Sequence, residues 1–511
     1  MGGKEKGISL GFLFLLLFSA LLAGCGNEEE ERPEIVWVLR EENEELYNSL
    51  KGIEKIEEAT GVDITFRLMT YDEYNYMIAF GDYPDVMVSN LYTGEVLDLY
   101  DKGITMDLTD LILEKSVYLK EIYERRPDIY KEVQTNDGKL IYFPSINPLE
   151  EQEDFYRNSY SGLLIRQDWL DRLGLEIPET IEEWHTVLTA FRDQDPNGNG
   201  LADELPFDDV RLWTFAPAFG ILDGIFVTPE GRVAYGCMEE GYREYLTVMN
   251  QWYREGLISR AAVTGSSKWS EANIIGNLSG SFYGLDNAWR YYLPNLQKKA
   301  KNADLTAVPI PRAANGVSYC NVSRLSSHIR DLVTVVTTNC KNPEAALKVI
   351  DYMYSEEGTT LLTWGIEGET YKTLPDGSKA LLPEALEMNE DSGYLKLHHV
   401  AIGHIAFPKY DGETVLLQTY PEEQLTAEMV WADCDTSLLY PANILFSVED
   451  RKKVNSLMLN IDAYASEQKT AFITGEQSME KYDDFLETLR TMQIEEVIRI
   501  YQKNYDIYRK K

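Results

Sequence analysis

The chain has 511 residues, with 48 Lys and Arg against 85 Asp and Glu, and its net charge at neutral pH is −37. This acidity argues against a sequence-independent nucleic-acid binder, which must neutralise rows of phosphates. Hydrophobic residues make up 44% of the chain and aromatic residues 12%, so a folded protein is indicated and disorder is excluded for most of the length. At this length we expect two or more domains.

The amino-terminal residues have the pattern of an export signal. Lys4 and Lys6 precede an apolar run over residues 8–22, which is short for a membrane span and typical of a signal peptide. The run ends in Leu22-Ala23-Gly24-Cys25, which resembles the lipobox of bacterial lipoproteins. We therefore expect residues 1–24 to be a lipoprotein signal peptide, with an uncleaved anchor as the alternative.

The expected lipoprotein has a single attachment to the membrane. Cys25 would carry the lipid, a diacylglyceryl group with palmitate, and residues 25–33 would form an acidic tether. No later stretch reaches the roughly 18 apolar residues that a membrane span needs. This predicts a globular protein on the outer face of the cell membrane, held there by its lipid alone.

Metal-binding and disulfide patterns are sparse. The other four cysteines lie far apart without the paired spacing of a metal site: Cys237, Cys320, Cys340 and Cys434. One or two disulfides can form outside the cell, but the sequence does not assign their pairing. Five His residues leave little material for a His-based zinc site.

The first elements alternate between strands and helices. In chain order we predict a strand over 35–39, a helix over 42–60, a strand over 62–68, a helix over 71–80 and a strand over 85–88. A strand over 162–166 follows, and then a short helix that contains Trp169 and Leu170. Such alternation predicts a parallel, doubly wound sheet.

Later helices have clear boundary signals. Thr180 and Glu183 form a capping box, and Trp184, Val187, Leu188 and Phe191 fall on one buried stripe. Residues 332–336 predict a strand, and Asn342-Pro343 opens another amphipathic helix. The last 60 residues are predicted to be mostly helical.

Several segments together resemble extracellular solute-binding lipoproteins of carbohydrate ABC importers, in the large oligosaccharide-binding branch of Gram-positive bacteria (family 1). The segments that carry the resemblance are residues 81–86 (Gly-Asp-Tyr-Pro-Asp-Val), 165–175 (Ile-Arg-Gln-Asp-Trp-Leu-Asp-Arg-Leu-Gly-Leu), 178–184, 364–368 (Trp-Gly-Ile-Glu-Gly) and 472–475 (Phe-Ile-Thr-Gly). The resemblance covers nearly the whole chain after residue 33.

The resemblance implies an α/β protein with the two-lobed periplasmic-binding-protein type II fold and a helical C-terminal region. The N-terminal lobe would comprise residues 34–155 and about 305–365, and the C-terminal lobe residues 156–304 and about 366–511. It further implies a monomer that captures an oligosaccharide between its lobes and delivers it to the permease subunits of an ABC transporter, without catalysis. Ligands of such sheets bind at the carboxyl ends of the strands.

Residues 193–204, Asp-Gln-Asp-Pro-Asn-Gly-Asn-Gly-Leu-Ala-Asp-Glu, have the composition of a calcium loop, since a hard cation needs six or more oxygens at a tight bend. If the first ligand is Asp193, the sequence of the loop matches the EF-hand pattern. We prefer a second register, because family members resemble it and it uses every oxygen of the run. Its ligands would be Asp195, Asn197, Asn199, the Leu201 carbonyl, Asp203 and Glu204. The alternative is a turn without metal. Bound calcium would be structural.

Aromatic residues with polar neighbours are the candidate sugar contacts, because an indole packs on the C–H face of a sugar while polar groups pair with its hydroxyls. By resemblance and by their position past strands, the candidates are Trp213, Tyr283, Asn287, Trp289, Arg290, Trp364, Glu367 and Tyr371, with Asp85 and Arg166 as second-rank candidates at the hinge or rim. We expect at least two of Trp213, Trp289 and Trp364 to line the site; for each residue, core packing is the alternative.

Two other functions remain open from the sequence. One is a surface lipoprotein enzyme acting on glycans, a hydrolase or lyase that uses two carboxylates. The other is a ligand sensor that docks on a receptor kinase. No nucleophile elbow, phosphate-binding loop or zinc-protease motif is found in the sequence.

Overall fold

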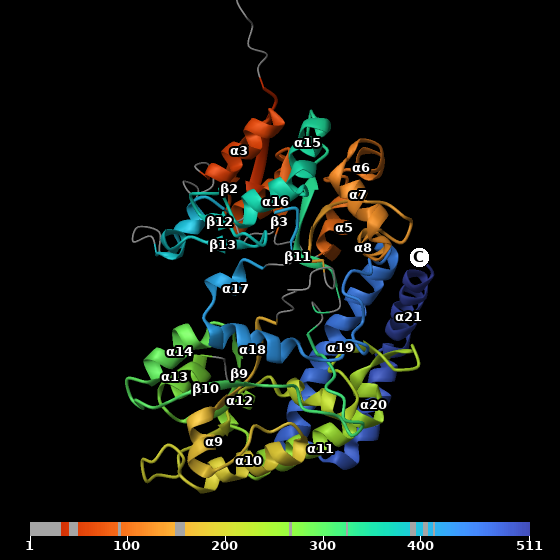
Figure 1. The fold of residues 1–511 in the computed structure, drawn as a ribbon. Helices are drawn as coiled ribbons and strands as arrows, with labels where there is room; N and C mark the ends of the chain where they lie inside the picture. Colours follow the sequence, from red (N-terminus) through yellow and green to blue (C-terminus); the bar gives the residue numbers. More distant parts are fainter. Residues whose placement is uncertain are drawn as a thin grey trace, which may run out of the picture.

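The computed structural model describes residues 32–39, 50–89, 93–148, 159–264, 268–322, 325, 327–388, 395–401, 407–411 and 414–511. The predicted signal peptide, Cys25 and most of the tether lie outside these residues, as do residues 42–49 of the first predicted helix. The described elements form two lobes, each with its own sheet and core (Figure 1). Within the described ranges, none of the helices combines the length and apolar character needed to cross a membrane.

The first lobe is built on a six-stranded sheet with the order β14-β4-β11-β3-β1-β2. Its strands are β1 (Glu34–Leu39), β2 (Asp63–Leu68), β3 (Val86–Ser89), β4 (Phe143–Ile146), β11 (Ile329–Val336) and β14 (Lys409–Tyr410). All five predicted strands are therefore found, one of them (residues 161–166) in the second lobe. Their ends agree with the predicted ends within one residue, except that β11 begins three residues earlier than predicted. The sheet is buried on both faces: Trp37 and Val38, which alternate on β1, are both fully buried.

The predicted parallel sheet is found for the first three strands but not for the whole sheet. Strands β2, β1 and β3 are parallel, as the alternation of strands and helices requires. Strand β11, however, returns from the second lobe and lies antiparallel between β3 and β4. A pairing between segments some 240 residues apart leaves no local pattern in the sequence.

Helices cover this sheet. They are α3 (Lys51–Thr60), α4 (Tyr71–Phe80), α5 (Thr93–Asp101), α6 (Thr109–Lys115), α7 (Tyr118–Arg125), α8 (Pro127–Val133), α15 (Pro343–Met353) and α16 (Glu356–Thr363). Helix α4 matches its predicted bounds because Thr70 and Glu73 form a reciprocal capping box at its start. A hairpin of β12 (Tyr371–Thr373) and β13 (Lys379–Leu381) adds a small separate core that contains Trp364 and Tyr371.

The second lobe is built on a four-stranded sheet with the order β10-β5-β9-β6. Its strands are β5 (Ser161–Arg166), β6 (Leu205–Phe207), β9 (Ser279–Leu285) and β10 (Leu305–Val308), and β7 (Ile225–Val227) pairs with β8 (Val233–Tyr235) in a separate ribbon. Strand β5 is antiparallel to β9 and β10, whereas β6 and β9 are parallel. Leu163 and Ile165 face the main core, and Leu164 faces a smaller core on the other side.

The helices of this lobe are α9 (Gln167–Leu173), α10 (Ile181–Asp193), α11 (Glu240–Arg254), α12 (Arg260–Thr264), α13 (Lys268–Ile275), α14 (Ala288–Leu296), α18 (Glu422–Ala432) and α20 (Tyr482–Thr491). The predicted capping box of Thr180 and Glu183 is confirmed, and the predicted stripe of α10 is buried. Short α17 (Leu416–Thr419) lies between the lobes (Figure 1).

The chain crosses between the lobes repeatedly, and the crossings begin and end at facing edges of the two sheets. It leaves the first sheet at Ile146 and enters the second at Ser161, and it returns between Val308 and Ile329. It leaves again after Tyr410. A further crossing lies between Leu439, which pairs with Phe226, and Leu445, which is in the first core. These facing edges are therefore the interlobe edges of the sheets.

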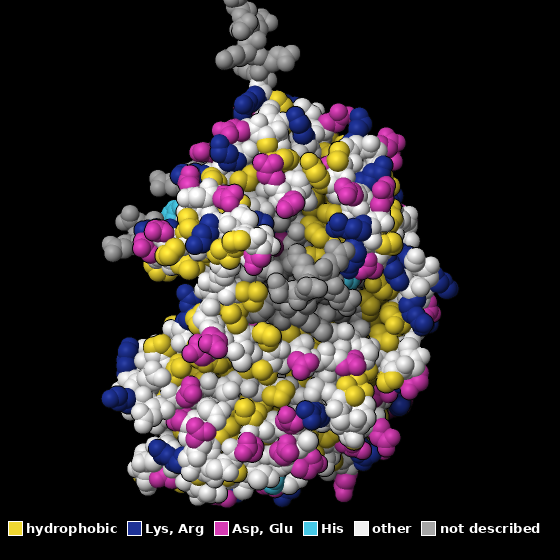
Figure 2. Space-filling model, in the orientation of Figure 1, with side chains coloured by type: hydrophobic (Ala, Val, Ile, Leu, Met, Phe, Trp, Pro, Cys, Tyr) yellow, Lys and Arg dark blue, Asp and Glu magenta, His cyan; other side chains and the backbone are white. Residues whose placement is uncertain are grey.

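Two long terminal helices, α19 (Val448–Thr474) and α21 (Ile494–Lys510), connect the lobes along one side (Figure 1). At the start of α19, Arg451 pairs with Asp98 and Asp101 on α5 of the first lobe. Its far end accepts hydrogen bonds from α11 of the second lobe. On the opposite side the surface is hollowed between the lobes (Figure 2). The prediction of a mostly helical C-terminal region is confirmed.

Candidate functional site

The strongest candidate site lies at the interlobe edge of the second sheet. Parallel strands β6 and β9 both end there, and β5 begins there at Ser161. Asp209 follows the end of β6, the short helix η1 (Leu212–Phe219) then places Trp213 beside it, and Tyr283 stands near the end of β9. Segments that are 70 residues apart in sequence are thus brought together at the edge that faces the other lobe.

One indole, one phenol and one guanidinium lie together at this edge. The ring centroids of Trp213 and Tyr283 are 5.3 Å apart, with 52° between their planes. The Arg211 guanidinium carbon lies 4.7 Å from the centroid of the Tyr283 ring, and its Nη2 donates to the Tyr283 carbonyl at 2.7 Å. The Tyr283 hydroxyl and Ser161 Oγ are 2.9 Å apart. Trp213 is partly exposed, whereas Tyr283 is buried.

An ion pair between the buried Asp209 and the partly exposed Arg211 orients this group. Asp209 accepts two hydrogen bonds from the Arg211 guanidinium, at 2.8 and 2.7 Å. Burial lowers the pKa of Arg211, but the hydrogen bonds to Asp209 more than offset this and hold the pKa above its ordinary value. The guanidinium is therefore a fixed charge held over the Tyr283 ring.

Asp209 and Arg211 were not among the residues predicted from the sequence. Their signal was a carboxylate and a guanidinium at alternate positions directly after a strand, just before Trp213. Gln424 on α18 was not predicted either; it is buried and donates to Asp286 Oδ2 at 2.9 Å, just after the end of β9. No local pattern joins Gln424 to a strand that ends 139 residues earlier.

The next predicted group begins α14 at the same edge. Asn287 is the N-cap and is exposed, as is Arg290. Trp289 is partly buried; its Nε1 donates to the Leu305 carbonyl at 3.2 Å, and its ring packs 6.4 Å from that of Trp431. The one polar atom of the indole and part of its ring surface thus have partners within the lobe.

Of the remaining predicted contacts, Trp364 and Tyr371 lie in the small core of the β12–β13 hairpin. Trp364 and Tyr371 are each 8% exposed, and their ring centroids are 6.1 Å apart. Glu367 is exposed and accepts from the Thr373 N–H at 3.1 Å. Trp364 also lines a polar groove of about 690 Å³ with Arg125, Tyr410 and other residues of α7 and α16.

The two second-rank candidates lie elsewhere. Asp85 precedes β3 and accepts from the Val36 N–H at 2.9 Å, at the edge of the first sheet that is remote from the second lobe. Arg166 is 1% exposed: it makes two 2.8 Å hydrogen bonds to Asp168, donates to Asn277 and lies over the Trp169 ring. Both side chains are committed to contacts within one lobe.

The predicted calcium loop connects α10 to β6. Asp195, Gly198 and Gly200 all have positive φ, so the backbone turns tightly there. Asp195 accepts from the backbone N–H groups of residues 199 and 200, at 3.1 and 3.0 Å, and the Asp203 carboxylate accepts from the Asn199 side-chain amide. Asp193 instead points to Arg192, at 2.7 and 2.8 Å, and is outside this convergence.

Glu204 is the unusual member of the loop. It is 9% exposed, and neither carboxylate oxygen has a hydrogen-bond donor. Burial raises the pKa of Glu204, and the nearby Asp195 and Asp203 carboxylates raise it further. Across the described ranges, no three His, Cys, Asp or Glu side chains form a ready metal cluster. The buried oxygens of Glu204 nonetheless fit a cation, because a cation would give them the partner that no hydrogen-bond donor of the loop supplies.

The four cysteines outside the predicted lipobox are present as thiols. Burial raises the pKa of Cys237 to about 12 and that of Cys340 to about 11. Both therefore stay protonated at neutral pH, which makes them poor nucleophiles.

Comparisons with known proteins match the chain over most of its length. A family model described as bacterial extracellular solute-binding protein matches residues 49–360. The fructooligosaccharide ABC transporter substrate-binding protein FusA of Streptococcus pneumoniae is 25% identical over 89% of this chain and 86% of its own. Lipoprotein LipO of Bacillus subtilis is 24% identical over 97% of this chain and 98% of its own. Structures of FusA with kestose and of a FusA EF-hand mutant with fructo-nystose, both 22% identical, align with TM-scores of 0.70 and 0.69 over 93% of this chain and 99% of theirs.

Proposed function

The chain belongs to the bacterial extracellular solute-binding proteins, and on that premise we propose that it captures an oligosaccharide between its lobes and delivers it to the permease of an ABC importer. The observation that carries the proposal is the group of Trp213, Tyr283 and the Arg211–Asp209 pair at the interlobe edge. The FusA and LipO relatives support the class of ligand and the membrane tether.

The chemistry of this group suits a sugar. The partly exposed Trp213 ring offers an apolar face for the C–H face of a pyranose or furanose. Asp209 and Arg211 supply an acceptor and a donor that are held in place before the sugar arrives. Nothing in the group is placed as a nucleophile with an adjacent base, so the proposal is capture without bond cleavage.

In this proposal the predicted site residues divide into those that contact the sugar and those that support the site. In this proposal Trp213, Tyr283 and the exposed Asn287 and Arg290 contact sugar, together with the newly found Asp209 and Arg211. Trp289, Trp364 and Tyr371 support the site through packing, and Glu367 lies at the outer rim. Asp85 and Arg166 serve the structure of their own lobes.

Sheet membership suggests a change to the predicted lobe boundaries. Residues 371–410 include the β12–β13 hairpin and β14, and β14 pairs with β4 of the first sheet. We therefore assign residues up to about 411 to the first lobe, rather than ending its second segment at about 365. The second lobe keeps residues 159–308 and most of the chain from α18 onward.

The function is tested with a soluble form that begins at Gly26 and so omits the predicted lipidated Cys25. Thermal-shift screening against an oligosaccharide panel that includes kestose should find at least one stabilising sugar, and that sugar should lower the radius of gyration in small-angle scattering because the lobes close around it. Cleavage of the stabilising sugar without compaction would instead support the enzyme alternative. No stabilisation by any member of the panel would contradict the proposal.

Calcium in the loop of Asp195–Glu204 is part of the proposal. The ligands would be Asp195, Asn197, Asn199, the Leu201 carbonyl, Asp203 and Glu204. The orphaned oxygens of Glu204 and the engagement of Asp193 with Arg192 support this register. Bound calcium would fix the loop that leads into β6, the strand that ends at Asp209.

Removal of calcium tests the loop. EGTA should lower the melting temperature, since a cation at a hundredfold excess over its Kd stabilises by about 2.7 kcal/mol. Asp203→Ala should abolish the response, whereas the matched control Asp193→Ala should keep it. If Asp193→Ala abolishes the response and Asp203→Ala keeps it, the first register is correct; identical wild-type melting in EGTA and calcium means that the loop binds no metal.

The lipid anchor at Cys25 completes the proposal. One modified thiol would carry all hydrophobic attachment, so Cys25→Ala should move the protein from the membrane fraction to the medium or the soluble fraction without changing its melting temperature. Unchanged membrane association of that variant would refute the lipoprotein assignment.

A further inference from the structure

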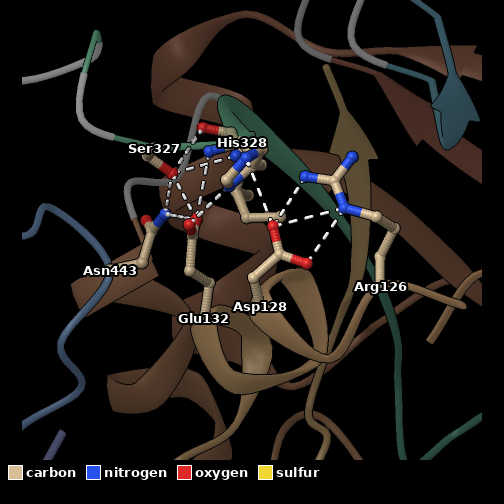
Figure 3. Close-up of polar contacts among 7 residues, drawn as sticks. Arg126, Asp128, Glu132, Ser327, His328 and Asn443 are labelled. Atoms are coloured by element: carbon tan, nitrogen blue, oxygen red, sulfur yellow. Dashed lines mark hydrogen bonds and ion pairs between the residues drawn. The ribbon is translucent and has the colours of Figure 1, made fainter. Parts of the chain in front are cut away.

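A buried carboxylate in the first lobe joins three of the segments that cross between the lobes. Glu132 lies near the end of α8 and is 6% exposed. Ser327 and His328 directly precede β11 on the second crossing, and Asn443 lies on the crossing between Leu439 and α19. Figure 3 shows these side chains converging on the Glu132 carboxylate.

The contacts engage both oxygens of Glu132. Ser327 Oγ donates to Oε2 at 2.8 Å, and the backbone N–H of His328 donates to the same oxygen at 3.1 Å. The His328 ring contributes Nδ1, 2.7 Å from Oε1. Asn443 Nδ2 donates to Ser327 Oγ and lies 3.4 Å from Oε2. The first crossing joins through Asn147, whose N–H donates to the His328 carbonyl at 2.7 Å.

The outer side of His328 is also held. Its Nε2 lies 3.5 Å from Asp128 Oδ2, and Arg126 donates to Asp128 at 2.9 and 2.6 Å (Figure 3). The imidazole therefore stands between two carboxylates of α8. The start of β11 cannot shift along α8 without breaking contacts on both sides of the ring.

Closure of a two-lobed protein occurs at a few residues that absorb large changes of φ and ψ. A buried carboxylate is tolerated only with its hydrogen bonds in place, so the residues bound to Glu132 are poor places to bend. We therefore expect the backbone to bend in those parts of the crossings that lie between the residues bound to Glu132 and the second lobe.

We propose that Glu132 is a positioning residue that sets the balance between the open and closed arrangements, although it touches no ligand. By fixing three crossings to α8, it limits the lobe orientations that the ligand-free protein visits. The inference rests on the proposed function only in that closure is what captures the ligand.

Asp351 on α15 provides a matched control. It is also 6% exposed, and it accepts from Ser116 Oγ at 2.5 Å and from the N–H groups of residues 117, 118 and 119 at 2.7, 3.2 and 2.9 Å. All of these partners lie in the first lobe. Loss of either carboxylate should therefore reduce stability similarly, but only Glu132 is bound to the crossings.

The experiment compares E132Q with D351N in the full mature protein without sugar. Spin labels on genetically encoded side chains at the exposed residues Glu124 and Lys299, one on each lobe, report the interlobe distance distribution. We expect E132Q to populate an interlobe distance that is rare in the wild type, since loss of a charge-assisted hydrogen bond changes a two-state ratio about tenfold. D351N should keep the wild-type distribution.

If E132Q lowers the melting temperature as D351N does but keeps the wild-type distances, Glu132 is merely structural and the proposal is wrong. Should E132Q fail to fold, Ser327→Ala removes one donor alone and must alter the distances in the same way; an unchanged distribution there also overturns the proposal. Because no sugar is present, failure to identify a ligand does not affect the outcome.

Discussion

Two aromatic pairs of the second lobe differ in what surrounds them. Trp213 and Tyr283 lie beside the Arg211–Asp209 pair at the interlobe edge, and the Trp213 indole is partly exposed. Trp289 and Trp431 pack in a small core on one face of the sheet, and both indole N–H groups donate to backbone carbonyls of the lobe. The Trp213 ring is therefore open to a ligand, whereas in the second pair the fold buries the Trp431 ring and engages both indole N–H groups.

The contrast shows what separates a binding platform from a core residue. Trp213 and Trp289 look alike in the sequence, since each follows a strand and has polar neighbours. The difference lies in whether the fold occupies the ring faces and the N–H group. Four mutations test this distinction, one of them a control, beginning with the largest expected effect.

Replacement of Trp431 should damage the fold most. Trp431 is 2% exposed, its Nε1 donates to the Leu163 carbonyl at 2.9 Å, and its ring lies directly on Gly162, where a Cβ would be within 2.3 Å of it. Trp431→Ala leaves a large cavity and should lower the free energy of unfolding by about 3–5 kcal/mol, measured by urea denaturation. A loss below about 1 kcal/mol would mean that this face is not a packed core.

Much of the fold could be predicted because its signals are local. The α4 and α10 caps, the buried stripe of α10 and the strands around residues 34–89 follow from spacing over fewer than twenty residues. The antiparallel place of β11 and the joining of Glu132 to Ser327 and Asn443 depend on contacts across 195 and 311 residues. Periodicity carries no information about such pairings.

The site was predicted in part for the same reason. Aromatic type suggested Trp213 and Tyr283, which the fold brings together, but the same reasoning selected Trp289 and Trp364, which pack in small cores. Burial of a ring by a segment more than a hundred residues away, as by Trp431, could not be anticipated. The loop of Asp195–Glu204 was found because its oxygens lie within ten residues.

Replacement of Trp213 should reduce binding and spare the fold. Trp213→Ala removes the exposed aromatic face, and the Kd for the sugar identified by screening should rise about tenfold, which corresponds to about 1.4 kcal/mol. The free energy of unfolding should change by less than about 1 kcal/mol, because the ring is only partly buried. Isothermal titration calorimetry gives the Kd and urea denaturation gives the stability.

Trp289→Phe is the control for that measurement. It removes the hydrogen bond to the Leu305 carbonyl but keeps an aromatic ring in the small core. It should lower stability by about 1 kcal/mol and leave the Kd unchanged. If the two variants change the Kd equally, Trp213 does not differ from Trp289 as a sugar contact, and the distinction is wrong.

Replacement of the Tyr283 hydroxyl should have the smallest effect. Tyr283→Phe keeps the ring between Trp213 and Arg211 and removes only the hydrogen bond with Ser161 Oγ, which is worth about 1 kcal/mol. Burial raises the pKa of Tyr283 above its ordinary value near 10, so the hydroxyl stays protonated at pH 6 and at pH 9. The difference in Kd between wild type and Tyr283→Phe should therefore be small and equal at the two pH values, measured by calorimetry.

A tenfold or greater loss of affinity in Tyr283→Phe would instead show that the hydroxyl binds the sugar directly. A loss that appears only at pH 9 would mean that the phenol ionises, and that the ring is less buried in solution than the structure indicates.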